Sequence, residues 1–156
     1  MPYRVRPATL DDLDLLVAHR IAMFTDMNVA VDAAMLQPAF ARWLRETMPA
    51  GAYRAWLVED ENGRIVAGGG ATIIPWPPGP QYPGDRLAFV YNVYVEPALR
   101  RRGLARMVMD ALHAWCREHG VGSVALNASQ DGQPLYEAMG YVATPAPMMF
   151  LRVVGV

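Results

Sequence analysis

The sequence predicts one α/β domain over residues 1–156, built as a mixed sheet with helices on both faces. Three observations lead to this prediction. Apolar segments of strand length alternate with segments whose apolar residues recur at helical spacing. These segments follow the order β-α-α-β-β-β-α-β-α-β-β, and the chain contains no repeat, linker or low-complexity tract. Because 53% of its 156 residues are hydrophobic, the chain can form a single core.

The first 47 residues predict a strand and two helices. Tyr3–Arg6 alternates like a short strand, and Thr9 with Asp12 resembles a capping box at the start of a helix. The apolar face of that helix would consist of Leu10, Leu13, Val17, Ile21 and Phe24. A second helix is expected over Pro38–Thr47, because proline suits the first turn of a helix.

A β-hairpin is expected next. Its strands would be Ala52–Val58 and Arg64–Ile74, and the connection Asp60–Gly63 contains the pair Asn-Gly, which favours tight hairpin turns. Three glycines, Gly68–Gly70, lie inside the second strand. They indicate a bulge, or the close approach of another group to the backbone.

The strand Leu87–Val95 is the centre of the predicted fold. Both of its faces are mostly apolar, so we expect it to be buried on both sides. A helix over Arg101–His119 and a strand over Val121–Ala128 follow, which predicts a right-handed crossover between parallel neighbours. The remaining predicted elements are a short helix, Asp131–Met139, and two antiparallel strands, Tyr141–Thr144 and Met148–Val154.

The turn between the central strand and its crossover helix predicts an anion site. Pro97 ends the strand, three arginines follow, and Gly103 precedes the helical pattern. The first turn of a helix presents unpaired N–H groups and the positive end of the helix dipole. We therefore expect a phosphate at this turn, held mainly by backbone amides, with arginine side chains as further donors.

Two blocks of sequence resemble a known family. Arg100-x-x-Gly103-x-Ala105 resembles the acyl-CoA pyrophosphate motif, Arg/Gln-x-x-Gly-x-Gly/Ala, of the GCN5-related N-acetyltransferase (GNAT) family. The block from Leu126-Asn-Ala-Ser129 to Leu135-Tyr136-Glu137-x-x-Gly140-Tyr141 resembles that family's later signature, which ends in Leu-Tyr-Glu-x-x-Gly-Phe. The opening segment, Tyr3–Asp12, is also similar to the family's first strand and helix cap.

The resemblance implies a GNAT-like fold and an acetyl transfer from acetyl-CoA to a primary amine, by direct attack in a ternary complex. It implies that the two strands flanking the crossover helix splay apart and admit the acyl-CoA. The implied cofactor-binding residues are Val93, Tyr94, Val95, Arg100, Arg101, Arg102, Gly103, Leu104, Ala105, Asn127 and Ser129. Ser129 stands where many family members have asparagine, and it could equally be a helix N-cap.

Tyr136 is the candidate catalytic residue. The resemblance places it near the CoA sulfur, where a phenol could protonate the leaving thiolate as a general acid. The alternative is a core tyrosine on an amphipathic helix. The general base stays open between Glu96, Asp26, His19 and a water molecule held by Asn92 or Tyr94.

The acceptor site is less defined. The resemblance implies that its wall comes from the first two helices and the loop Pro75–Gly84. The residues there that could contact an amine are Met23, Phe24, Asp26, Met27, Phe40, Trp43, Trp76 and Tyr82. Asp26 could hold an ammonium group, and the aromatic rings could line a pocket or stack on a cation. The acceptor could be a small molecule or a peptide amine.

Composition excludes several other functions. The chain has no lysine, so Schiff-base chemistry is excluded, and its one cysteine excludes an internal disulfide and a multi-cysteine metal site. A net charge of −1 gives no basis for binding nucleic acid or an anionic membrane, although Arg100–Arg102 keep a nucleic-acid module as a distant alternative. We expect no metal. The other alternative is a non-catalytic acyl-CoA-binding or regulatory domain of the same fold.

Two expectations concern the state of the protein. Without a signal-peptide pattern or a bilayer-spanning apolar run, a cytoplasmic protein is expected. The apolar segment Met148–Val154 suggests a strand edge covered by a second copy, and hence a homodimer.

Overall fold

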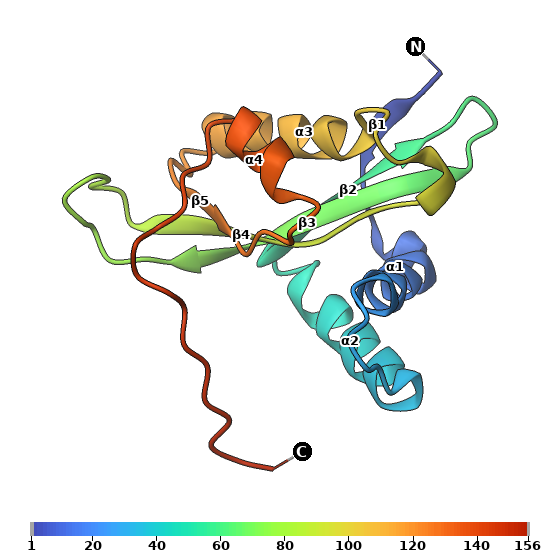
Figure 1. The fold of residues 1–156 in the computed structure, drawn as a ribbon, viewed down its shortest axis with the longest axis horizontal. Coiled ribbons are helices and arrows are strands. Elements are labelled where there is room, and N and C mark those ends of the chain that lie inside the picture. The colour runs from blue at the N-terminus through green and yellow to red at the C-terminus, as the bar shows by residue number, and fades with distance from the viewer. Residues whose placement is uncertain (1, 156) are drawn as a thin grey trace.

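A five-stranded mixed sheet forms the centre of the protein (Figure 1). A computed structural model describes residues 2–155. The strands lie in sequence order: β1 (Arg4–Pro7), β2 (Tyr53–Glu59), β3 (Ile65–Pro75), β4 (Arg86–Val95) and β5 (Val124–Leu126). The first four strands pair antiparallel, whereas β4 and β5 are parallel. This confirms the predicted mixed sheet.

Helices cover both faces of the sheet, as predicted (Figure 1). The helices α1 (Leu13–Asp26) and α2 (Ala33–Thr47) lie on one face, and α3 (Leu104–Glu118) and α4 (Gln133–Ala138) lie on the other. Two 3-10 turns, Leu10–Asp12 and Pro97–Leu99, precede α1 and follow β4. The helix α3 makes the predicted crossover between the parallel strands β4 and β5.

The hydrophobic core has two layers, one on each side of the sheet. Val108, Met109 and Leu112 of α3 are fully buried in the first layer, together with apolar residues of β2, β3 and β4. Leu44 of α2 and Leu57 of β2 are fully buried in the second. The central strand is less buried than predicted, because Tyr91 is 40% exposed. Beyond Val90, Asn92 is buried and Val93–Val95 are half-buried.

The second helix begins earlier than predicted. Asp32 caps it, because its side chain accepts a hydrogen bond from the Met35 amide, and the helix runs from Ala33. Pro38 consequently lies inside α2 and not in its first turn. The predicted capping box is confirmed, since Thr9 and Asp12 bond reciprocally before α1.

The prediction of two final strands is wrong. Residues 141–155 contain no strand, and β5 covers only Val124–Leu126 of the predicted Val121–Ala128. The residue types favoured strands, but a strand also needs a partner edge. Pro145 and Pro147 lack N–H donors and fix the backbone between the two predicted strands, which disfavours a tight hairpin between them.

A network of four charged residues ties β1 to β2 and to the start of α1. Glu59 accepts hydrogen bonds from Arg4 at 2.6 Å and Arg6 at 2.5 Å, and Arg6 also bonds both carboxylate oxygens of Asp12 at 2.8 and 2.9 Å. Hydrogen bonds from Arg6 lower the pKa of Asp12, and those from Arg4 and Arg6 lower the pKa of Glu59.

We expect this network to make the protein less stable in acid. Carboxyl groups with a lowered folded-state pKa stabilise the fold above their unfolded pKa of about 4, and this contribution is lost as the pH falls through the folded value. Urea denaturation between pH 7 and 2 should show this loss, and Glu59→Gln should reduce its size. An equal pH dependence in E59Q would contradict a role for this network.

Candidate functional site

The parallel strands β4 and β5 separate after three residue pairs. Ala88, Phe89 and Val90 pair with Val124–Leu126, and β4 then continues to Val95 without a parallel neighbour among the described residues. The predicted splaying of the two strands is therefore confirmed. It leaves an open backbone edge on the second half of β4, of the kind that can pair with an extended ligand.

A β-bulge turns the backbone of β4 at the point where the strands separate. The β3–β4 register shifts between Gly68 and Gly70, and Asn92 has a positive φ of 62°. Before the bulge, Ala88 donates its N–H toward β5, to Ser123; after it, Glu96 donates toward β3, to Val66. Because backbone groups alternate sides along a strand, Val93 and Val95 then direct theirs toward the open edge.

Gly69 allows this bulge to form. A Cβ atom at this position would lie 3.3 Å from the Cα of Val93 and 3.0 Å from Cγ1 of Val108. Neither neighbour can move freely, because one is backbone and the other is a buried valine of α3. The predicted role of the Gly68–Gly70 run, a bulge and a close approach, is confirmed.

We expect Gly69→Ala to destabilise the protein by about 1–3 kcal/mol, because the added methyl group overpacks the interface between β3, β4 and α3. Denaturant unfolding measures this change. Gly79→Ala is the matched control, since a Cβ at Gly79 meets nothing within 4 Å. Equal stability of the two variants would show that the bulge tolerates the extra atom.

The turn before α3 exposes a run of backbone amides. Arg101 and Gly103 both have left-handed backbone conformations, with φ of 63° and 81°. The amides of residues 101–106 donate to no acceptor in the described part of the chain, and no side chain caps the helix. Successive amides in such a turn form a concave anion site at the positive end of a helix dipole. The geometry thus fits the predicted phosphate site.

The three arginines of this turn differ in their contacts. Arg100 donates from Nε to the carbonyl of Val95 at 3.1 Å and forms an ion pair with Asp26 of α1 at 2.5 Å. Arg101 and Arg102 are exposed and form no ion pair within residues 2–155. Arg101 and Arg102 therefore have guanidinium groups available for an anion, while Arg100 links the turn to α1.

Tyr136 lies on α4 at the edge of the core layer that contains α3. It is nearly buried, its ring contacts that of Tyr141 edge-on at 5.7 Å between centroids, and its hydroxyl bonds to no other described residue. Burial raises the pKa of Tyr136, so its phenol stays protonated at neutral pH. Both predicted alternatives, core residue and proton donor, are compatible with this position.

Two further predicted cofactor residues lie after β5. Ser129 accepts a hydrogen bond from the Gly132 amide at 3.1 Å, so it caps the turn that leads into α4. The Asn127 side chain contacts the sulfur of Met148 at 3.8 Å, which places the start of the C-terminal segment beside this end of β5.

The candidate general bases either form ion pairs or have a lowered pKa. Glu96 pairs with Arg64 at 3.0 Å, and Asp26 pairs with Arg100, so neither carboxylate is free. Burial lowers the pKa of His19 to about 4, which keeps its imidazole neutral at pH 7. Its ring lies 4.9 Å from that of Tyr94, at the end of β4. His19 thus lies over Gly68 of β3 and beside Tyr94, whereas Glu96 pairs with Arg64 of the β2–β3 hairpin.

The predicted acceptor wall is only partly accessible. Phe40 is buried, and its ring stacks on that of Trp43, which also contacts Tyr53. The Tyr82 hydroxyl accepts a hydrogen bond from the Gly122 amide, so it fastens the loop before β4 to the segment after α3. Trp76 is 48% exposed.

A polar chain between α1 and the sheet was missed in the sequence. Arg20 donates to the side-chain oxygen of Asn92 at 2.5 Å, and Asn92 donates to the Tyr53 hydroxyl at 2.9 Å. The Arg20 guanidinium also lies over the rings of Phe24 and Phe40. One feature of the sequence indicates this polar chain. Arg20 is a charged residue on the apolar face of the helix, four positions from both Leu16 and Phe24. These contacts hold the bulge residue Asn92 against α1.

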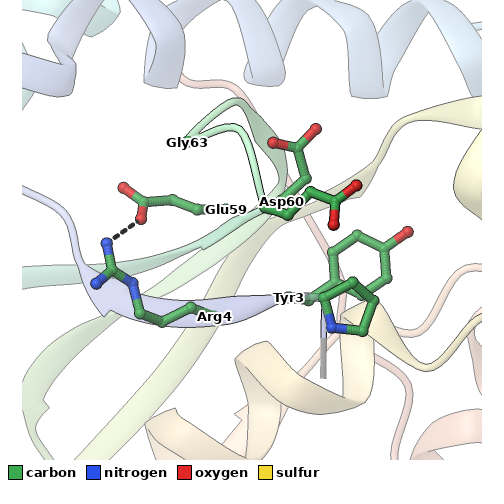
Figure 2. Close-up of a pocket in the computed structure, with 7 residues that line it drawn as sticks. Tyr3, Arg4, Glu59, Asp60 and Gly63 are labelled. Carbon is green, nitrogen blue, oxygen red and sulfur yellow. Dashed lines mark hydrogen bonds and ion pairs between the residues drawn. The ribbon is translucent and has the colours of Figure 1, made fainter.

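One hollow in the surface lies away from this site. It has a volume of about 680 Å³ and lies at the β1 and β2 side of the sheet, lined by residues including Tyr3, Arg4, Glu59 and Asp60 (Figure 2). Arg4 and Glu59 pair with each other across it. These two charges neutralise each other, whereas Glu61 in the same lining forms no ion pair among residues 2–155. No cluster suited to a metal ion occurs among residues 2–155, and no described helix is long and apolar enough to cross a bilayer.

Comparison with solved structures identifies the class of fold. The chain is 35% identical to a GCN5-related N-acetyltransferase from Ralstonia eutropha JMP134, with a TM-score of 0.85 over 96% of this chain and 98% of that one. A predicted acetyltransferase with acetyl-CoA, from Clostridium acetobutylicum, is 24% identical, with a TM-score of 0.86 and 96% coverage of both chains. An aminoglycoside N-acetyltransferase in complex with CoA shares the fold at 15% identity, with a TM-score of 0.76 over 97% and 95%.

The class that these matching structures define is that of the acetyltransferases. The sequence profile of the acetyltransferase (GNAT) family matches residues 23–141, which include the splayed strands, the turn before α3 and Tyr136. The protein belongs to the GNAT acetyltransferase family, as the resemblance implied. No curated protein matches the sequence.

Proposed function

We propose that the protein is an N-acetyltransferase that moves an acetyl group from acetyl-CoA to a primary amine by direct attack. One observation carries this proposal. A run of free amides at the start of α3 adjoins the open backbone edge of β4, so a single extended ligand with a phosphate group can use both. Acetyl-CoA has this form, because its diphosphate is joined to a long amide-bearing arm.

The diphosphate would bind at the turn before α3. Amides of Arg101, Arg102, Gly103, Leu104 and Ala105 would donate to its oxygens, and the side chains of Arg101 and Arg102 would add charged hydrogen bonds. The pantetheine arm would run along Val93–Val95 like an added strand. Arg100 donates a hydrogen bond to the Val95 carbonyl, so Arg100 would hold the end of the β4 segment along which the arm pairs.

The thioester would then lie near the bulge. The N–H of Val93, directed toward the open edge, would donate to the thioester oxygen as charge develops on it. The neutral amine attacks the carbonyl carbon, a C–N bond forms, and the C–S bond breaks. Tyr136 would give its phenolic proton to the departing sulfur, and the amine would lose a proton to a base or to water. Cys116 is buried on α3 and burial raises its pKa, so a covalent acetyl-cysteine is not part of the scheme.

The acceptor would approach from the side of α1 and Trp76, and it would be a small-molecule or peptide amine. An accessible aromatic ring at Trp76 supports contact with a cationic or apolar acceptor. Nucleic acid is not proposed as a partner, because the net charge is −1.

The test is release of free thiol from acetyl-CoA with a panel of amines, read against the reaction without amine. Amine-dependent release supports the proposal. Acetyl-CoA binding, measured by calorimetry, without release for any amine would favour the alternative, a non-catalytic acyl-CoA-binding domain. Absence of binding at millimolar acetyl-CoA would overturn both.

A further inference from the structure

Arg20 of α1 differs from every other arginine in the described part of the chain. Among residues 2–155, only Arg6 and Arg20 are arginines that are not exposed. Arg6 pairs with Asp12 and Glu59, whereas Arg20 pairs with no carboxylate of residues 2–155. A charged group that leaves water normally gains an opposite charge in compensation. Around Arg20 that compensation is missing.

The side chains that contact the Arg20 guanidinium are neutral. Its Nη1 donates to Oδ1 of Asn92 at 2.5 Å, and its Cζ lies 4.9 and 5.0 Å from the ring centroids of Phe24 and Phe40. Two aromatic faces stabilise a cation in part, but they accept no strong hydrogen bond. Nε and Nη2 form no hydrogen bond with residues 2–155, so this guanidinium keeps donors for a planar anion.

The surroundings of Arg20 are polar enough to hold a charge and open enough to admit a ligand. Burial lowers the pKa of Arg20, and the two groups that raise it are the phenols of Tyr53 and Tyr91, not a carboxylate. Arg20 is half-buried, and the neighbouring Tyr91 is 40% exposed. An anion from solvent can therefore reach this cation.

Asn92 connects Arg20 to the proposed reaction centre. It is the bulge residue of β4, and it directly precedes Val93, whose N–H would donate to the thioester oxygen. Arg20 lies on the side of the sheet that α1 and α2 cover, from which the acceptor would approach (Figure 1). A compact acceptor, with its amine and an anionic group only a few bonds apart, could reach both places at once.

We propose that Arg20 binds the carboxylate of the acceptor, which is therefore an amino acid. This inference rests on the proposed acetyl transfer. A guanidinium holds a carboxylate through two parallel N–H···O bonds, and the carboxylate supplies the opposite charge that Arg20 lacks. One guanidinium matches the single charge of a carboxylate, whereas a phosphate group carries up to two. The rings of Phe24 and Tyr91 would contact the apolar part of the same acceptor.

The first test compares free amino acids with the C-terminal amide of each, by thiol release from acetyl-CoA. The wild-type protein should favour the free acid about 10- to 100-fold in kcat/KM for its best pair, because the amide cannot form the charged hydrogen bonds. The amine itself cannot cause this preference. A neighbouring carboxylate keeps an amine protonated, which makes the free acid the poorer nucleophile at neutral pH.

Arg20→Gln tests the residue. It should raise KM for the free acid and abolish the difference between acid and amide, with the dissociation constant of acetyl-CoA unchanged. The acid-to-amide ratio is measured within one variant, so it does not depend on the folded fraction of the sample. Arg42→Gln is the matched control, because Arg42 is exposed on α2 and forms no ion pair within residues 2–155. R42Q should keep the preference. If R20Q lowered the turnover of acid and amide by the same factor, Arg20 would only support the fold, and the inference would be overturned.

Asn92→Asp tests the missing charge without removing Arg20. Aspartate has nearly the shape of asparagine and tolerates a positive φ, and its carboxylate would face Nη1 of Arg20. The Tyr53 hydroxyl, which accepts from Asn92, can donate to the carboxylate instead. N92D should therefore fold and lose the preference for free acids, and it decides the inference if R20Q does not fold by circular dichroism. A preference that survives in N92D would overturn the inference.

The failure of this inference differs from the failure of the proposed function. If amines are acetylated but free acids have no advantage over their amides, the role of Arg20 is wrong and the acetyl transfer stands. If acetyl-CoA binds and no amino acid, amide or other amine gives thiol release, the acetyl transfer is wrong, and the role of Arg20 falls with it.

Discussion

Gly103→Val should weaken acetyl-CoA binding at least about 10-fold, or by about 1.4 kcal/mol. Gly103 has a φ of 81°, a conformation that a β-branched residue adopts only under strain. A Cβ at this position would meet no atom of the protein within 4 Å, so the requirement for glycine is one of backbone conformation. Changing this conformation would turn the neighbouring amides away from a common anion. Isothermal calorimetry with acetyl-CoA measures the loss.

Gly63→Val is the matched control. Gly63 has nearly the same φ, 78°, also has open space around a Cβ, and lies in the β2–β3 hairpin. Both variants should lose similar stability, about 1–2 kcal/mol, because both force a side chain into the left-handed region. Only G103V should lose affinity. Equal affinities in the two variants would refute the assignment of the turn before α3 as the diphosphate site.

Tyr136→Phe should lower kcat about 100-fold and leave the dissociation constant of acetyl-CoA nearly unchanged. General acid catalysis typically contributes a factor of about 10²–10⁴, and the substitution removes the proton while keeping the ring that packs in the core. Since burial raises the pKa of Tyr136, the wild-type activity should not decline on the alkaline side until the pH exceeds about 10. Thiol release with the best amine of the panel, followed against pH, measures both effects.

Tyr141→Phe serves as the comparison. Tyr141 touches the Tyr136 ring, and its hydroxyl bonds His113, so its loss should reduce stability but not kcat. If Y136F retained wild-type kcat, Tyr136 would be a core residue and the thiolate would take its proton from elsewhere. If Y141F lost as much activity as Y136F, the proton donor would have been assigned to the wrong tyrosine.

Local patterns in the sequence predicted most of the fold. The capping box at Thr9, the Asn-Gly turn and the glycine run in β3 each depend on neighbouring residues, and each is confirmed. The errors concern choices that neighbours do not determine. The start of α2 is set by its cap, Asp32, which precedes the segment predicted to be helical. The two final strands would have needed a sheet edge as a partner, and residues 141–155 pair with none.

Parts of the candidate site could not be predicted, because they join distant residues. The Arg100–Asp26 pair spans 74 positions, and the Arg20–Asn92 bond spans 72. Local spacing cannot identify the partner of either arginine, because that partner lies on a distant segment. The positive φ of Arg101 is also invisible in residue type, since residues other than glycine, asparagine and aspartate seldom adopt it. The sequence indicated that β4 and the turn before α3 form the site. The directions of their backbone amides are visible only in the folded structure.

The early end of β5 has a consequence for the protein without its ligand. Among residues 2–155, the second half of β4 has a neighbouring strand on one side only, so its outward amides have no strand partner. A molecule that occupies that side would serve as a missing strand and shield those amides. Deuterium uptake at Val93 and Val95 should therefore slow when acetyl-CoA is added, and hydrogen exchange would report occupancy without any turnover.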